Sequence, residues 1–335
     1  MRTGAQEAPD VFLSGLLFLD TGFSGLTAVP VPGTEVWAEQ VTSAPGGIAN
    51  FAVTLRRLGL RVALAAAFGD DMGGTYCWRA LAQAEGVQLS SSRRFVGWPT
   101  PVTVSLAYDG DRALVTHAEP PPVEPDELVG DPPASPAAIV HIGPKPLEWV
   151  RRAHAAGTLV FADVGWDPSG QWDGALLDQL ALCHAFMPNA AEAMAYTRTD
   201  SPAAALARLA DLVPLAVVTC GSAGVLAVDG TTGESAAVPG VPVQAIDSTG
   251  AGDVFGASLV AGTLAGWPLP ERLRFAALVA ALSTRRPGAA AAAPRWAELA
   301  SWWHAVRAAP AQPRLRRDYA FLDRVLPSDP GTRQP

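Results

Sequence analysis

The stretch "DSTGAGDVFGASLV", residues 247–260, decides the fold expected for this chain. An acid stands at each end of a loop of small residues, and an apolar segment of helical length begins where the loop ends. The first turn of a helix leaves backbone N–H groups without partners and carries a partial positive charge. Because Gly250, Ala251 and Gly252 lack bulky side chains, these N–H groups can approach an anion closely. The stretch therefore predicts a phosphate-sized anion site.

Asp253 gives this anion site a chemical role. A carboxylate at the positive end of a helix is expected to stay ionised, and it would repel a phosphate unless an acceptor hydroxyl lay between them. Phosphoryl transfer has a loose transition state, so catalysis is mostly positioning and charge stabilisation. Asp253 would orient the hydroxyl and take its proton late, while the loop N–H groups hold the transferring group. The alternative is an ordinary helix start made of small residues.

Composition narrows the class of protein. The 335 residues, 49% hydrophobic and 17% charged, suffice for one large α/β domain or two modest ones. A net charge of −8 argues against nucleic-acid binding but not against ATP, whose site is built locally. The three unpatterned cysteines indicate buried thiols in a reducing cytoplasm. The apolar run at 11–19 is too short to span a bilayer, so no membrane association and a cytosolic protein are expected.

Lys145 is the only lysine of the chain. It lies in "GPKP", which is neither the GxxxxGK[ST] of a P-loop nor the VAIK-like strand of a protein kinase. No GxGxxG follows the first apolar run, which disfavours a Rossmann dehydrogenase.

The order of apolar and helical patterns predicts one α/β domain over 11–308 with a mostly parallel sheet. Two segments depart from this alternation. Residues 20–43 are rich in turn formers, and residues 98–118 hold two alternating runs around "DGDR", a hairpin signal. Both are expected to form a small sheet apart from the main one. Residues 309–335 are expected to be a flexible C-terminal tail.

Two separated motifs resemble the signatures of the ribokinase (PfkB) family of carbohydrate kinases. "GGIANFAVTLRRLG" (46–59), with Gly69, resembles the N-terminal signature, and 247–260 resembles the C-terminal one. Three further stretches resemble the family's Asn-x-x-Glu motif, nucleotide loop and adenine-side helix: "MPNAAEA" (187–193), "VVTCGSAGVLAV" (217–228) and "FAALVAALSTRRPGA" (275–289). The resemblance, from about residue 11 to 296, implies a ribokinase-like three-layer α/β sandwich with a small β-sheet lid. It also implies a homodimer through the lid sheets.

The resemblance also implies roles for particular residues. Asp253 would be the catalytic base, with Gly250, Ala251 and Gly252 as the anion hole. Asp20 follows the first apolar run, where α/β ligands usually sit, and its carboxylate can accept two hydroxyl protons. The implied sugar-binding residues are Asp20, Gly46, Gly47, Asn50, Arg112 on the lid and Lys145. The implied nucleotide-binding residues are Asn189, Glu192, Thr219, Gly221, Gly224 and Ala277, with Glu192 binding Mg²⁺ through water. The residues implied for a monovalent cation such as K⁺ are Asp247, Thr249 and Gly288.

Departures from the family pattern leave the substrate open. Ala277 stands where many members have an Asn, which leaves the nucleotide preference open. Pro144 and Lys145 stand where some members have an acid that reaches the substrate. Lys145 would favour an acidic sugar or a phosphate group there, or is simply a solvated lysine. Arg112 either caps the substrate or pairs with Asp109 or Asp111.

The function expected is transfer of the γ-phosphate of ATP, with Mg²⁺, to a hydroxymethyl group of a small sugar or sugar acid. One alternative is a nucleoside kinase, with a base pocket built from Phe23, Trp37 and Trp98. Another is a sugar-binding or regulatory homologue that has lost catalysis.

Overall fold

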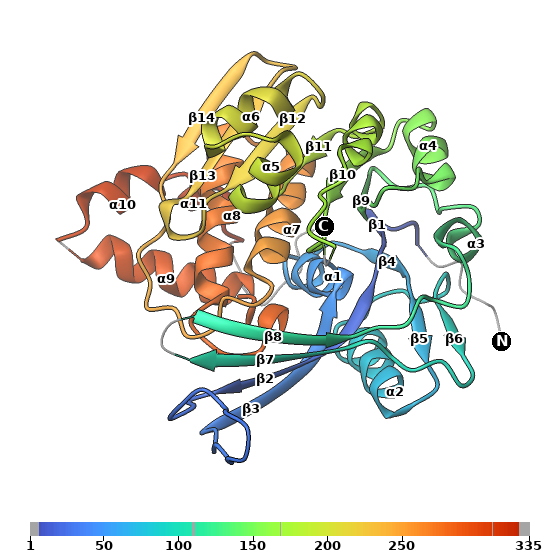
Figure 1. Cartoon of the computed structure of the whole chain (residues 1–335). Coiled ribbons are helices and arrows are strands. Elements are labelled where there is room, and N and C mark those ends of the chain that lie inside the picture. The colour runs from blue at the N-terminus through green and yellow to red at the C-terminus, as the bar shows by residue number, and fades with distance from the viewer. Residues whose placement is uncertain (1–6, 109–110, 168, 310, 328–335) are drawn as a thin grey trace.

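The computed structural model describes residues 7–108, 111–167, 169–309 and 311–327. Its centre is an eight-stranded sheet (Figure 1). All pairs from β4 to β12 are parallel, while β13 runs antiparallel to both of its neighbours, so the predicted mostly parallel sheet is confirmed. The strand order is β14 (Glu234–Val238), β13 (Val225–Asp229), β12 (Leu215–Thr219), β11 (Ala185–Phe186), β10 (Leu159–Asp163), β9 (Ala137–His141), β1 (Val11–Ser14) and β4 (Val62–Ala65).

Helices cover both faces of this sheet, which makes the three layers predicted from sequence. Val11 and Leu13 of β1 belong to one core, and Phe12 between them belongs to the other. A strand that is buried on both faces needs apolar side chains on both, which explains the unbroken apolar run at the start of β1. The first core is closed by α1 (Ile48–Arg57), α2 (Met72–Arg79), α7 (Ala251–Leu264), α8 (Leu269–Ser283) and α9 (Trp296–Ala308), and the second by α4 (Glu148–Ala155), the 3₁₀ helix Gly174–Leu182, α5 (Ala190–Thr197) and α6 (Pro202–Ala210).

A second, four-stranded sheet stands apart from the main one, as predicted. Its order is β3 (Gln40–Gly47), β2 (Leu17–Ser24), β7 (Val102–Tyr108) and β8 (Asp111–His117). In Figure 1 it crosses the lower part of the view, below α7 and α9. The hairpin tip at 109–110 lies outside the described residues.

Short elements complete the chain. A two-stranded sheet joins β5 (Ala67–Gly69) and β6 (Arg93–Phe95), and a π-helical turn (Ala80–Ala84) extends α2. The remaining elements are α3 (Pro125–Val129), the 3₁₀ turns Gly221–Ala223 and Ala289–Ala292, α10 (Pro313–Asp318) and α11 (Leu322–Val325). Among the described residues, no helix combines the length and apolarity that crossing a bilayer requires.

The segment after α9 differs from the expected flexible tail. Within residues 311–327 it forms α10 and α11, and Tyr319, Phe321, Leu322 and Val325 are buried in the first core. Burial of these apolar side chains stabilises the segment in its place on the first core. The polarity of its arginines, which suggested a solvated tail, does not prevent this packing. Residue 310 and residues 328–335 of the predicted tail lie outside the described part.

The strand order reverses beside β1. The chain runs from β1 to β4 on one side and later enters β9 on the other. In open α/β sheets, ligands bind where the order reverses, beyond the carboxyl ends of the strands.

Gly47, with a φ of 60°, turns the chain from β3 into α1. A Cβ there would lie 2.4 Å from the carbonyl oxygen of Leu16. This close approach lets α1 begin beside the place where the strand order reverses.

Candidate active site

The glycine loop ends at the N-terminus of α7, as predicted. Gly250 takes the left-handed conformation (φ 69°) and is the N-cap residue, with no side chain to occupy the helix end. Ala251, Gly252 and Asp253 then form the first turn. A Cβ on Gly250 would lie 3.0 Å from Asn50 Nδ2, so the residue is also confined by its surroundings. The N–H of Ala251 donates to the carbonyl of Ser248 (3.3 Å), and Gly250 adds no side-chain cap, so the helix end is left accessible to an anion.

Asn50 holds the carboxylate of Asp253. Its Nδ2 donates a hydrogen bond of 2.7 Å to Asp253 Oδ2, and its Oδ1 accepts one from the N–H of Ala290. Asn50 is only 2% exposed. The family resemblance implied a sugar contact for this residue. The structure shows that its amide orients Asp253, a contact between residues far apart in the chain.

Burial changes the protonation expected for Asp253. It raises the pKa of this carboxyl to about 7, against the hydrogen bond from Asn50. The charges of Asp20 and Glu192 raise the pKa further, and Arg112 lowers it. The sequence led us to expect a carboxylate kept ionised by the helix terminus. Instead, loss of solvation dominates, and Asp253 becomes an acid–base group that titrates near neutral pH.

Asp20 lies on β2, in the lid sheet, and points into a space left by Gly46. A Cβ on Gly46 would lie 1.9 Å from Asp20 Oδ2, so no larger residue fits there. Burial raises the pKa of Asp20 to about 7; Asp247 adds to this effect and Arg112 opposes it. Asp20 and Asp253 thus belong to one electrostatic cluster, since Asp20 also raises the pKa of Asp253.

Asn189 and Glu192 form a capping box at the start of α5. Asn189 Oδ1 accepts from the Glu192 N–H (3.0 Å), and Glu192 Oε2 accepts from the Asn189 N–H (2.9 Å). Glu192 is buried, and burial raises its pKa. A bridge between Asn189 and Thr219 places the end of β12 beside this box. Three residues predicted to act on the nucleotide are thus brought together.

The segment after β12 turns sharply at two glycines. Gly221 and Gly224 have φ values of 55° and 107°, and a Cβ on Gly224 would lie 2.0 Å from the carbonyl oxygen of Val238. Ala277 lies on α8, half-buried against the first core. The position that the resemblance implied for the nucleotide therefore carries a side chain that offers no hydrogen bond.

Asp247, Thr249 and Gly288 also meet. Asp247 Oδ1 accepts from the Thr249 N–H (2.9 Å), and Oδ2 accepts from the Gly288 N–H (3.1 Å). Thr249 Oγ1 is buried and has no hydrogen-bond partner within the described residues. A buried oxygen without a partner is costly, so this hydroxyl is available to an additional ligand.

Arg112 and Lys145 lie in different surroundings. Arg112, on β8, donates to Ser248 Oγ and so joins the lid to the loop before α7. A cleft of about 230 Å³ lies between the lid and this loop, and it is lined by residues 24–26, 107–108, 112 and 245–248. Lys145 is 81% exposed and its Nζ lies 3.5 Å from Glu124 Oε1. Its ammonium therefore has a surface partner, whereas Arg112 faces the cleft. Asp109, considered as an alternative partner of Arg112, lies outside the described residues.

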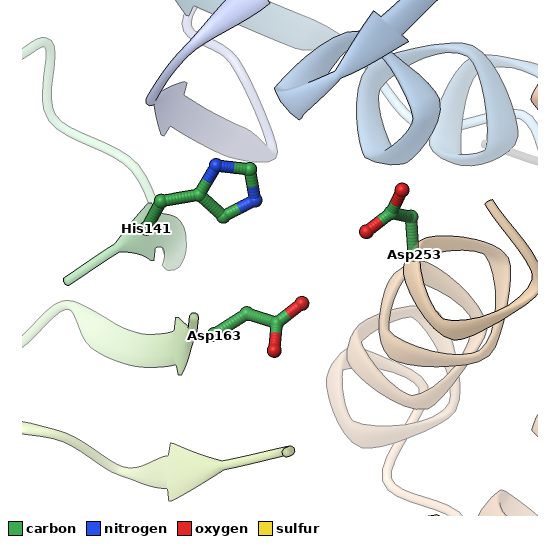
Figure 2. Close-up of side chains that lie close together, drawn as sticks. All are labelled: His141, Asp163 and Asp253. Carbon is green, nitrogen blue, oxygen red and sulfur yellow. The ribbon is translucent and has the colours of Figure 1, made fainter. Parts of the chain in front are cut away.

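Two polar residues near Asp253 were not identified from the sequence. His141 ends β9 and Asp163 ends the neighbouring strand β10, where the two are register partners. Figure 2 shows both side chains directed toward Asp253. Burial lowers the pKa of His141 to about 4, so its imidazole is neutral near pH 7. Burial raises the pKa of Asp163 well above its usual range, and Asp253 and Glu192 add to this shift.

Comparison with known proteins agrees with the fold and with this site. Residues 25–296 match the pfkB family of carbohydrate kinases. A fructokinase of Klebsiella pneumoniae is 32% identical over 283 residues, covering 75% of this chain and 89% of that protein. The ribokinase of Arabidopsis thaliana, solved with ribose and ATP, has a TM-score of 0.70 at 24% identity over 86% of this chain and 96% of its own. An Escherichia coli protein assigned as a ribokinase II, solved with ATP and Mg²⁺, has a TM-score of 0.74 at 21% identity, covering 89% and 99%.

The chain belongs to the pfkB family of carbohydrate kinases. It is therefore a phosphotransferase with a sugar as acceptor. The family and the ribokinase-like fold predicted from the two signatures are both confirmed.

Proposed function

We propose that this protein transfers the γ-phosphate of ATP to a hydroxymethyl group of a small sugar, with Asp253 as the catalytic base. The observation that supports this most is the position of Asp253. It is half-buried in the first turn of α7, directly after the glycine loop, and Asn50 holds its carboxylate at 2.7 Å. A proton acceptor and a set of backbone donors thus flank one space, which is what transfer to an alcohol requires.

The reaction would proceed by positioning. Asp20 would accept hydrogen bonds from sugar hydroxyls, and the hydroxymethyl oxygen would lie against Asp253. The N–H groups of Gly250, Ala251 and Gly252 would hold the transferring phosphoryl group and stabilise its charge. The hydroxyl proton would pass to Asp253 late, because a loose transition state leaves the attacking oxygen weakly bonded. Arg112 would close the lid over the substrate.

The residues present fit ATP with Mg²⁺. One oxygen of Glu192 is fixed by the Asn189 N–H, which orients the carboxylate so that the other can accept from a Mg²⁺-bound water. Bound Mg²⁺ would neutralise charge on the phosphates. Thr219, Gly221 and Gly224 would line the nucleotide. A monovalent cation such as K⁺ would find oxygen ligands at Asp247 and Thr249, next to the turn at Gly288; the unpartnered Thr249 hydroxyl supports this.

A substrate panel tests the proposed function. Release of ADP is measured with fructose, ribose, a 2-keto sugar acid and adenosine, each with and without K⁺. Fructose leads the panel because the fructokinase relative matches most of the chain. The exposed pair of Lys145 with Glu124 gives no support to an acidic sugar. Turnover of adenosine alone would indicate a nucleoside kinase instead. Tight sugar binding without turnover would indicate a non-catalytic homologue.

The pH dependence of turnover should follow the titration of Asp20 and Asp253. We expect kcat/KM for the sugar to fall about tenfold per pH unit below a midpoint near pH 7. The sign follows from the base: below its pKa, Asp253 holds a proton and cannot accept another. Because Asp20 titrates in the same range, the midpoint belongs to the pair. Initial rates from pH 5 to 9 measure it, with circular dichroism as a folding control. A flat profile across this range would contradict the proposed base.

We also propose that the protein forms a homodimer through its lid sheets. Val41, Leu114 and Val115 on the lid strands are all more than half exposed, with Val115 at 64%. A small sheet with exposed apolar side chains is stabilised by packing against a second copy. We expect the mass of two chains in light scattering after gel filtration, and the mass of one chain for Val115→Asp. Leu212→Asp, an exposed leucine elsewhere, is the control. A monomeric wild-type protein would exclude this dimer.

A further inference from the structure

His141, Asp163 and Asp253 form a cluster that phosphoryl transfer does not by itself explain. They come from three elements: the ends of β9 and β10, and the first turn of α7. One possible ligand atom of each lies within 4.8 Å of the others. Figure 2 shows the imidazole ring and the two carboxyl groups facing a common space.

The three side chains offer a mixed donor set. A neutral imidazole nitrogen with two carboxylate oxygens suits borderline divalent cations such as Zn²⁺ or Co²⁺, whereas Mg²⁺ prefers oxygen ligands and bound water. The position of the ring is confined. A Cβ on Gly15 would lie 2.8 Å from His141 Nδ1, so the glycine directly after β1 makes room for the imidazole.

The cluster also brings two carboxyl groups close together, and each raises the cost of ionising the other. Asp163 is only 8% exposed, and it lies close to the carboxyl of Asp253. Among the causes that shift the pKa of Asp253, Arg112 supplies the positive charge, and its guanidinium also donates to Ser248 Oγ. A divalent cation between the two carboxyl groups would replace their protons and balance the charge of both carboxylates.

We propose that His141, Asp163 and Asp253 form a binding site for a borderline divalent cation such as Zn²⁺ or Co²⁺. Ligand atoms lie about 2.0–2.2 Å from such an ion, so the three would lie about 3–4 Å apart. Their separation of up to 4.8 Å is slightly open, and rotation of the carboxyl groups closes it. If Asp253 is the base, as proposed above, the bound ion occupies its oxygen, and metal binding and catalysis exclude each other.

Direct binding tests the site without relying on the reaction. Metal-stripped, nucleotide-free protein is titrated with Co²⁺ while the visible d–d absorption is recorded. We expect one Co²⁺ per chain, and an affinity at least about tenfold weaker in His141→Gln and Asp163→Asn, since each removes one ligand. His184→Gln is the matched control because His184 immediately precedes β11, at the opposite end of the sheet. Circular dichroism confirms that each variant folds.

The result that overturns the site is absence of a one-to-one Co²⁺ complex, or an affinity unchanged in both His141→Gln and Asp163→Asn. A thiolate charge-transfer band, lost when Cys220 is replaced, would move the site elsewhere and overturn it equally. Cys220 is the thiol to check because Cys77 and Cys183 are buried.

Turnover provides a separate readout. With excess Mg²⁺ and ATP, Zn²⁺ should inhibit sugar phosphorylation, and Asp163→Asn should require at least about tenfold more Zn²⁺ for the same fractional inhibition. If Co²⁺ binds as expected but Zn²⁺ leaves turnover unchanged, the site stands and the assignment of Asp253 as the base fails. If Co²⁺ does not bind, the site fails whatever the reaction proves to be.

Discussion

Replacing Asp253 by Asn should lower kcat by at least about 10²-fold while the protein stays folded. The amide cannot accept the hydroxyl proton, but it has nearly the same shape. Its oxygen can still accept the hydrogen bond from Asn50 Nδ2. The pKa of Asp253 is already raised by burial, so removing the charge should not destabilise the fold. Steady-state rates at saturating sugar and Mg²⁺–ATP measure the effect, with the melting temperature as the measure of stability.

The matched control is Asp173→Asn. Asp173 also stands at the start of a helix, where its carboxylate accepts from the Ala175 N–H, but it is exposed and belongs to none of the clusters described above. We expect its turnover to remain near that of the wild type. Turnover of Asp253→Asn within about threefold of the wild type would show that the carboxylate is not the base.

The sequence revealed those parts of the site whose residues are neighbours in the chain. The loop before α7 and Asp253 lie within seven residues, so helix-terminus physics alone places them together. Asn189 and Glu192 are three residues apart, and one turn of α5 makes them a capping box. In both cases local backbone geometry decides the contact, and the long-range fold is not needed to predict it.

Contacts between distant segments could not be predicted in the same way. Asn50 and Asp253 are 203 residues apart, and their hydrogen bond depends on how α1 packs against α7. His141 and Asp163 meet because β9 and β10 are adjacent parallel strands. The signal was present: each is the polar residue that follows an apolar run, at the carboxyl end of a strand. What was missing was the strand order that aligns these two ends.

Gly46→Ala should weaken sugar binding strongly, because the new methyl group would occupy the place of the Asp20 carboxyl. The Cβ would lie 1.9 Å from Asp20 Oδ2 and 2.2 Å from its Cγ, so the carboxyl must move. A hydrogen bond to a charged group contributes about 1.5–3 kcal/mol, which corresponds to about a 10- to 100-fold rise in the sugar KM. The KM for ATP should change little, since the residues proposed to bind the nucleotide lie at α5, after β12 and on α8.

The displaced atoms of Gly46→Ala end a short side chain and are not backbone, so the protein should fold. Gly174→Ala is the control, because a Cβ there would meet nothing within 4 Å and the KM should stay unchanged. The double variant Gly46→Ala, Asp20→Asn separates two explanations. If the methyl group acts through Asp20, adding it to Asp20→Asn should cost far less than adding it to the wild type. Full additivity of the two changes would show that Gly46 affects the sugar independently of Asp20.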